Sequence, residues 1–238
     1  MQLEQRLAQV KENSAAAARL AGRDPGEITL CAATKVQTDQ TIRDAIAAGL
    51  EVCGENRVQE LCAHLESDAY AGAKQVHFIG HLQTNKVNKV VGRVELIQSV
   101  DSEHLLMAIQ KQAQKLGIVQ DILLQVNIGC EASKGGVDEQ GLEALARQAS
   151  ALPNVRLRGL MAIPPVAVHP EDNTQYFVKM RQLFVDMQNK IAHNKNDINC
   201  LSMGMSADYR QAIAHGATIV RVGSALFGPR PAPSPRQD

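Results

Sequence analysis

The segment ITLCAATKVQTDQTIRDAIAAGLEVCGEN, residues 28–56, contains a strand, a helix and a second strand in succession. Residues 28–34 form a continuous apolar run typical of a buried strand. A helix follows, with Thr38 or Asp39 as its cap and Gly49 at its end, and residues 51–56 form the next strand candidate. Strands connected through helices pair in parallel, so the segment predicts one β-α-β unit of a parallel sheet.

The same alternation of strand and helix continues along the chain. Further runs typical of buried strands occupy residues 75–80, 94–100, 121–128, 155–163, 198–203 and 218–223. Segments typical of helices begin near residue 57 and cover residues 85–91, 103–116, 138–152, 172–193 and 207–215, and an extra helix at 3–20 precedes the series. Eight strands, each but the last followed by a helix, predict a single parallel (β/α)8 TIM-type barrel over residues 1–230 with a disordered tail at 231–238. An open doubly wound sheet is the alternative, but its G-x-G-x-x-G motif is missing after the first strand.

Composition argues against several classes of function. The chain contains 25 Lys and Arg and 25 Asp and Glu residues, so it lacks the basic excess of a nucleic-acid binder. Its five cysteines are scattered without a C-x-x-C pair, which favours reduced thiols over a disulfide framework or a zinc site. Neither a signal-peptide pattern nor a run of about 20 apolar residues, the length that crosses a bilayer, occurs. We therefore expect a cytoplasmic protein that binds neither nucleic acid nor membranes.

Lys35 directly follows the apolar run LCAAT of the first predicted strand. In a parallel barrel the loops after the strands form the active face, so the amine would lie there. Desolvation beside an apolar segment lowers the pKa of a lysine amine, and such amines form imines with aldehydes. The alternative is an ordinary lysine that ends a strand in solvent, and position alone favours that alternative.

Two segments near the end of the chain are typical of a phosphate site. SMGMSAD begins at residue 202 and RVGSALFG at residue 221, each at a predicted strand end. Both supply small residues beside a turn: Ser202, Gly204, Ser206, Gly223 and Ser224. Backbone N–H groups at such junctions bind anions, and barrels of this type recurrently bind phosphate after strands seven and eight. Two ordinary turns with serine caps are the alternative, which the consecutive strand ends disfavour.

Other polar candidates are weaker. His77 and His81 have the i, i+4 spacing of a metal site, but residues 75–80 form a predicted strand, so the two would not share a helix face, and a third ligand is lacking. We therefore expect no metal. Lys134, within the SKGG turn, has a positive charge that suits an anion, but an ordinary solvated loop lysine is the favoured interpretation.

Eight segments of the chain resemble those of the pyridoxal phosphate homeostasis proteins. The resemblance runs in order from about residue 28 to residue 228, and its motifs are very specific when taken together. They are ATK at Ala33, GENRVQE at Gly54, HFIGHLQTNK at His77, SVD at Ser99, QVNIGCEASKGG at Gln125, LRGLMAIPP at Leu157, LSMGMSADYRQAI at Leu201 and VRVGSALFG at Val220. The last one also resembles an element of alanine racemase barrels.

The resemblance implies a barrel like the N-terminal domain of alanine racemase, with pyridoxal 5′-phosphate (PLP) held as a Schiff base on Lys35. Arg221 would face the pyridine nitrogen, and Asn56 would lie near the ring. The remaining implied contacts bind the phosphate: Ser206, Gly223 and Ser224, with backbone help from Met203 and Gly204. This chain differs from many family members at positions such as Gln37, and none of these differences affects the proposed contacts to the cofactor.

The implied function is that of a PLP carrier or buffer without catalytic activity. Arginine cannot practically give up its proton, so Arg221 would leave the ring nitrogen unprotonated and the cofactor a weak electron sink. PLP-dependent apo-enzymes or amino acids are the expected partners, and we expect a monomer. A weak amino-acid racemase is the first alternative, and the predicted strand ends offer no tyrosine as a second acid or base. An aldolase-type barrel that binds a sugar phosphate on Lys35 without a cofactor is the second.

Overall fold

The strands form a closed, all-parallel barrel. The computed structural model describes residues 2–131, 135–166, 169–191 and 198–229. Its eight strands follow one another around the barrel in chain order, and β8 pairs with β1 to close it. They are β1 (Thr29–Ala33), β2 (Val52–Glu55), β3 (Gln75–Phe78), β4 (Leu96–Val100), β5 (Gln120–Val126), β6 (Val155–Ala162), β7 (Cys200–Ser202) and β8 (Ile219–Val222). The predicted (β/α)8 barrel is confirmed, and the open sheet is excluded.

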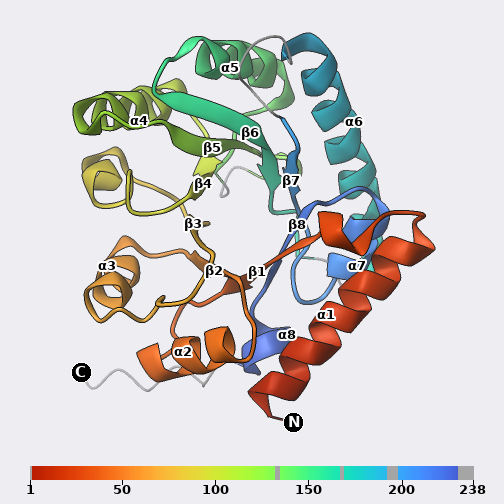
Figure 1. The fold of residues 1–238 in the computed structure, drawn as a ribbon. Helices are drawn as coiled ribbons and strands as arrows, with labels where there is room; N and C mark the ends of the chain where they lie inside the picture. The colour runs from red at the N-terminus through yellow and green to blue at the C-terminus, as the bar shows by residue number, and fades with distance from the viewer. Residues whose placement is uncertain (1, 132–134, 167–168, 192–197, 230–238) are drawn as a thin grey trace, which may run out of the picture.

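Helices surround the barrel, as Figure 1 shows in a view along its axis. The α-helices are α1 (Leu3–Leu20), α2 (Asp39–Ala47), α3 (Val58–Glu66), α4 (Glu103–Leu116), α5 (Glu139–Ala151), α6 (Thr174–Ile191), α7 (Tyr209–Ala214) and α8 (Ser224–Phe227). Three 3-10 helices, η1 (Pro25–Glu27), η2 (Thr84–Lys89) and η3 (Pro170–Asn173), complete the described elements. The helix predicted between β3 and β4 is therefore a 3-10 helix, and α8 was not predicted.

Side chains of the strands alternate between two layers. Inward-facing residues of six strands form a small apolar cluster inside the barrel: Cys31, Val52, Leu96, Leu123, Met161 and Ile219. Their neighbours along the strands, such as Ala32, Ile97 and Val220, face outward and pack under the helices in a larger core. Because the strand period is two, the same alternation directs some polar residues of β3, β4, β7 and β8 into the barrel.

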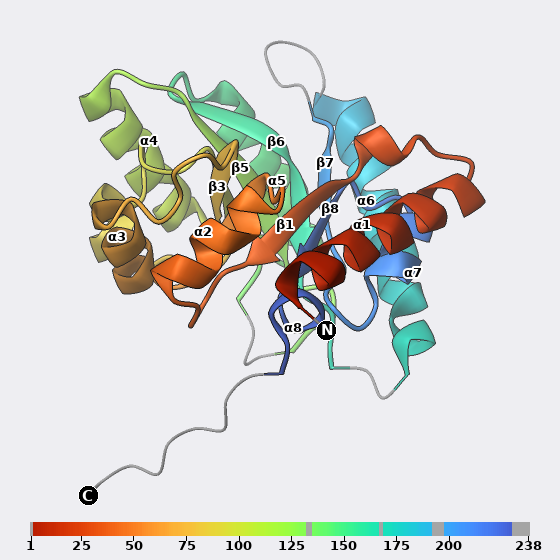
Figure 2. The same cartoon turned by 60° about the horizontal axis from the view of Figure 1, so that its bottom comes forward.

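The extra helix α1 packs outside the barrel, against α7 and α8 (Figure 1). Arg6 of α1 donates from Nε to the Leu226 carbonyl oxygen at 2.6 Å, so α1 also holds the short helix α8. Figure 2 places α8 directly after β8, at the carboxyl end of the barrel. The predicted N-terminal helix is confirmed, and it braces the end at which the last strand leaves the barrel.

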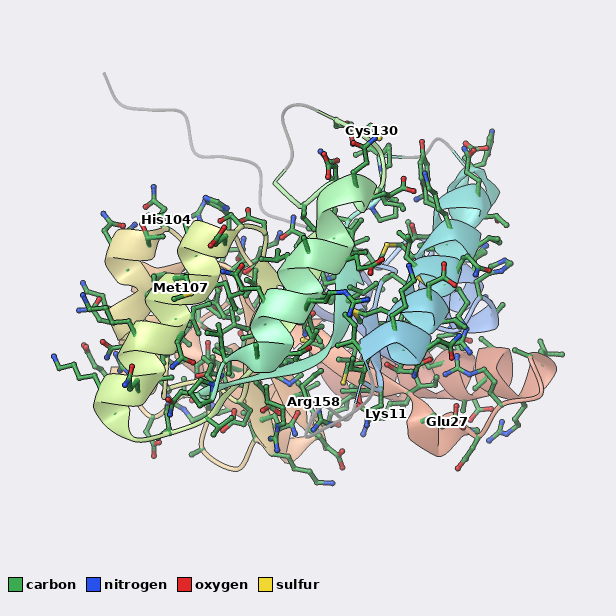
Figure 3. The ribbon with its side chains drawn as sticks, turned by 90° about the horizontal axis from the view of Figure 1, so that it is seen from above. Lys11, Glu27, His104, Met107, Cys130 and Arg158 are labelled. Carbon is green, nitrogen blue, oxygen red and sulfur yellow. The ribbon has the colours of Figure 1, made fainter. Side chains whose placement is uncertain are left out.

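The two ends of the barrel are distinguished in Figure 3. Cys130, beyond β5, lies at one end, whereas Glu27, before β1, and Arg158, within the first half of β6, lie toward the other. The loops at the Cys130 end follow the strands, so this end forms the active face of a parallel barrel. Among the described helices, none combines the length and apolar character needed to cross a bilayer.

Candidate functional site

A cavity of about 610 Å³ opens at the carboxyl end of the barrel. Its walls come from α8 and from loops that follow seven of the eight strands, all except β4. The lining contains most of the predicted cofactor-binding residues: Lys35, Asn56, Ser206, Arg221, Gly223 and Ser224. A large concave pocket at this end of the barrel is the expected place for a ligand.

Lys35 lies in a tight turn between β1 and α2. The Gln37 N–H donates to the Thr34 carbonyl oxygen at 3.0 Å and closes this turn. Val36 has φ 58°, a left-handed conformation that β-branched residues avoid. Its N–H donates to Glu60 Oε2 on α3 at 2.9 Å, which holds the turn from outside. Backbone strain is thus stored next to the candidate lysine.

The carboxyl group of Glu55 is buried next to the residues that precede or follow it at the ends of β1 and β2. Glu55 is fully buried, and it accepts hydrogen bonds from Thr34 Oγ1 at 3.1 Å and from the Tyr70 hydroxyl at 3.3 Å. Its other oxygen accepts from the Asn56 N–H at 2.9 Å. Burial raises the pKa of the Glu55 carboxyl, while the hydrogen bonds from Asn56 and Thr34 oppose that rise. Glu55 therefore ties the end of β1 to the end of β2, a role that its position in the sequence did not predict.

The two predicted phosphate segments meet at Ser206. Its hydroxyl oxygen accepts from the Gly223 N–H at 3.1 Å and from the Ala225 N–H at 3.2 Å. The loop after β7 is therefore joined to the loop after β8, and Ser224 lies between the two donors in the first turn of α8. This arrangement places hydroxyl and amide groups at one end of the cavity.

Met203 and Gly204 are not among the residues that line the cavity. Met203 is fully buried, and its N–H donates to the Ile219 carbonyl oxygen at 3.1 Å. Gly204 has φ 90°, and a Cβ there would lie 2.4 Å from Ala212 Cβ. It permits close packing of α7 on the end of β7. A phosphate role for these two residues stays a prediction that their placement does not support.

Arg221 lies inside the barrel and reaches the floor of the cavity. It is only 4 % exposed, and it donates from one terminal nitrogen to Ser202 Oγ and from the other to the Ala162 carbonyl oxygen at 2.8 Å. Burial lowers the pKa of its guanidinium to about 10, so the side chain remains a cation at neutral pH. The cavity floor is therefore positively charged.

The two histidines considered for a metal site do not come together. His77 is buried in the barrel, whereas His81 is exposed in the cavity lining, with Nδ1 3.5 Å from Asp101 Oδ2. Within the described parts of the chain, no group of three or more His, Cys, Asp or Glu side chains is placed to hold a metal ion. Lys134 and the predicted tail lie outside the described residues.

Several residues of the lining were not predicted from the sequence, including Ile79, Gln125 and Phe227. Strand alternation was a usable signal for two of them. Ile79 lies two residues after the inward-facing His77, and Gln125 lies two residues after Leu123 of the inner cluster. No comparable signal exists for Phe227, because it belongs to the helix that was not predicted.

Comparison with known proteins decides the family. The family model of the alanine racemase N-terminal domain matches residues 6–231. A pyridoxal phosphate homeostasis protein of Aquifex aeolicus is 44% identical over 226 residues, which cover 95% of this chain and 97% of the relative. The chain belongs to the pyridoxal phosphate homeostasis protein family.

Solved structures of similar sequence support this assignment. A protein of Bifidobacterium adolescentis superimposes with a TM-score of 0.87 at 36% identity, covering 94% of each chain. PipY of Synechococcus elongatus, solved with PLP bound, has a TM-score of 0.82 at 34% identity, covering 95% of this chain and 100% of its own. The family resemblance noted in the sequence is confirmed.

Proposed function

We propose that this chain binds PLP in the cavity at the carboxyl end of the barrel and acts as a carrier or buffer in intracellular PLP homeostasis. The observation that carries the proposal is one cavity that joins Lys35 to Ser206, Gly223 and Ser224. An aldehyde-reactive amine and an anion-binding end are the two groups that a phosphorylated aldehyde requires. The name of the Aquifex relative and the PLP bound to PipY agree with it.

In this proposal Lys35 holds PLP as a Schiff base. The lysine amine condenses with the aldehyde, a C=N bond forms, and one water molecule leaves. The reaction is reversible by water or by another amine, which a carrier requires. Ser206 and Ser224 hold the phosphate, and the Ser206 hydrogen bonds to Gly223 and Ala225 keep the two loops together before the ligand arrives.

The polar groups of the lining fit such a ligand. Asn56 Oδ1 is buried and has no hydrogen-bond partner among the described residues. An unpaired buried acceptor costs about 1–3 kcal/mol, so a hydroxyl group of the ligand would relieve that cost. Asn56 also lies next to Glu55, whose hydrogen bond fixes the Asn56 backbone. The cavity therefore offers an acceptor that its own walls leave unused.

The surroundings of Arg221 favour binding over catalysis. When bound, PLP supplies an aldehyde for the lysine and a ring that withdraws electrons as far as its nitrogen partner allows. The buried cation of Arg221 opposes protonation of a ring nitrogen at the cavity floor. Chemistry that depends on a strong electron sink is therefore poorly served, and we propose that this protein has no catalytic activity.

The weak racemase is disfavoured by the placement of the tyrosines. Tyr70 donates to Glu55, and Tyr209 is buried in α7. Tyr176 lies on α6, and none of the three tyrosines of the chain lines the cavity. A second acid or base on the far side of a substrate α-carbon is required for racemisation.

The absorption spectrum of the purified protein tests the proposal. Wild type with added PLP should show a yellow Schiff-base band, which borohydride reduction should fix to the peptide that contains Lys35. Lys35→Ala should lose the band, whereas Lys86→Ala should keep it, because Lys86 follows β3 on the same end of the barrel but outside the cavity lining. A wild-type protein that stays colourless with PLP would refute the proposal and reopen the aldolase-type alternative. Exchange of the α-proton of an amino acid by the wild type would favour the racemase.

A further inference from the structure

Polar side chains form a continuous chain of hydrogen bonds inside the barrel. Arg221 NH1 lies 2.5 Å from Ser202 Oγ, and Ser202 Oγ lies 2.6 Å from Gln98 Oε1. Gln98 Nε2 lies 2.9 Å from His77 Nδ1, and His77 Nε2 lies 2.8 Å from Gln75 Oε1. All but Gln75 are buried, so the chain runs from the cavity floor through the barrel interior toward its opposite end.

The direction of these hydrogen bonds follows from their chemistry. Arginine has no acceptor, so Ser202 Oγ accepts from Arg221 and its own proton must go to Gln98 Oε1. The Gln98 amide nitrogen then donates to His77 Nδ1, which must lack a proton. His77 Nε2 therefore carries the ring proton and donates to Gln75. Each residue therefore accepts a hydrogen bond from the neighbour nearer to Arg221 and donates one to the neighbour farther from it.

The opposite direction leaves a buried group unsatisfied. If the Gln98 amide were turned, its nitrogen would donate to Ser202 Oγ, which already accepts from Arg221. The hydroxyl proton of Ser202 would then have no acceptor along the chain. A buried unpaired donor costs about 1–3 kcal/mol, so the first direction is the stable one. This conclusion requires His77 to be neutral, as its burial in the barrel favours.

Arg221 also lacks the usual partner of a buried cation. Among the residues that the structure describes, no carboxylate forms an ion pair with its guanidinium, and Asp208 acts on it only from a longer distance. Its partners are instead the Ser202 hydroxyl and the Ala162 carbonyl oxygen. Aligned hydrogen bonds polarise one another, so the chain behind Ser202 strengthens the negative end that faces the cation.

We propose that Ser202, Gln98 and His77 are positioning residues, a one-way hydrogen-bond chain that holds and stabilises the Arg221 cation at the cavity floor in place of a carboxylate. The inference rests on the proposed function in one respect, which is that Arg221 faces the bound PLP. The neutral chain fixes the guanidinium without cancelling its charge. A carboxylate in the same place would fix it equally well but would neutralise the floor of the cavity.

The ligand-free protein provides the first test. Nitrogen-15 NMR of histidine-labelled protein, with the His77 signals assigned through His77→Gln, should show a proton on Nε2 and none on Nδ1. Gln98→Glu should reverse this tautomer, because a carboxylate accepts from both neighbours and requires a proton on His77 Nδ1. If His77 of the wild type carries its proton on Nδ1, the proposed direction of the hydrogen bonds is wrong, whether or not PLP binds.

Binding of PLP provides the second test, with a matched pair of buried glutamines. Gln98→Met breaks the chain, whereas Gln110→Met removes a buried amide of α4 that bonds Asn154 away from the cavity. By analogy with residues that orient ligand-binding groups, Gln98→Met should raise the Kd for PLP about 10-fold, and Gln110→Met should leave it near the wild-type value. Equal Kd values for the two variants would overturn the positioning role.

A second pair of variants keeps the test valid if Gln98→Met does not fold. Ser202→Ala removes the hydroxyl that Arg221 contacts, and Ser202→Thr retains a hydroxyl. PLP affinity should fall in the first and recover in the second, and an unchanged affinity in Ser202→Ala would count against the proposal. If wild type binds no PLP, the proposed function fails. The His77 tautomer then still tests whether the hydrogen-bond chain has the proposed direction.

Discussion

Acidification should destabilise this protein through His77. Burial in the barrel lowers the pKa of His77 from its ordinary 6.5 to about 4. The unfolded chain takes up the proton near pH 6.5 and the folded chain only near pH 4, so stability is lost as the pH falls through this interval. At about 1.4 kcal/mol for each pKa unit, the difference between 6.5 and about 4 corresponds to roughly 3 kcal/mol. That is a large part of the about 5–15 kcal/mol that stabilises a typical domain.

Urea unfolding of wild type and of His77→Gln, measured from about pH 7 to about pH 4.5, isolates this contribution. The substituted amide can accept from Gln98 and donate to Gln75, but it does not titrate. Other groups titrate in both proteins, so the quantity of interest is the difference in the free energy of unfolding between them. It should change by about 2 to 3 kcal/mol over this range, with wild type losing more.

Parallel loss of stability in the two proteins would refute the reasoning. It would mean that His77 has a similar pKa in the folded and unfolded chains. The NMR titration of His77 provides an independent check if His77→Gln does not fold. A folded-state pKa near 6.5 would contradict the argument that burial in the barrel disfavours the charged ring.

Three further substitutions test local features of the site. Val36→Asn should raise the free energy of unfolding by about 1 kcal/mol, because asparagine tolerates the left-handed backbone better than valine; an unchanged urea midpoint would contradict the strain. Gly80→Ala should disrupt the loops at the cavity, because a Cβ there would lie 2.0 Å from the Asn56 carbonyl oxygen. A soluble Gly80→Ala variant with wild-type PLP affinity would show that this close approach is dispensable. Tyr70→Phe should cost about 1 kcal/mol in urea unfolding, because its hydroxyl donates to the buried Glu55 carboxyl; equal stability would mean that the hydrogen bond contributes nothing.

The barrel was predictable because its signals are local. Each strand is an apolar run, each helix has caps or amphipathic spacing, and the order of the two types implies parallel pairing. Thr38, for example, caps α2 through a hydrogen bond from the Thr41 N–H, as its position before the helix suggested. The failures were also local: η2 has only six residues and α8 only four, too short for a periodic pattern.

The site was predictable only in part. Lys35 and Ser206 lie at strand ends, which the barrel topology brings together without further information. The hydrogen bond between Ser202 and Gln98 joins residues 104 positions apart, and no spacing rule reveals such a partner. Glu55 was similarly hidden, because a single carboxylate at a strand end has no distinctive pattern. Its role became visible only through its bonds to Thr34 and Tyr70.

Closure of the barrel through β1 and β8 has a consequence for biosynthesis. Ala32 pairs with Val222, so the loops that hold Lys35 and Ser224 are neighbours in space although the ribosome makes them at opposite ends of the described chain. A nascent polypeptide has its lysine early but gains the serine half of the cavity only when β8 emerges and docks. If PLP binds Lys35 as proposed, its capture reports that translation and folding of the whole barrel are complete, and truncated or stalled chains should remain colourless.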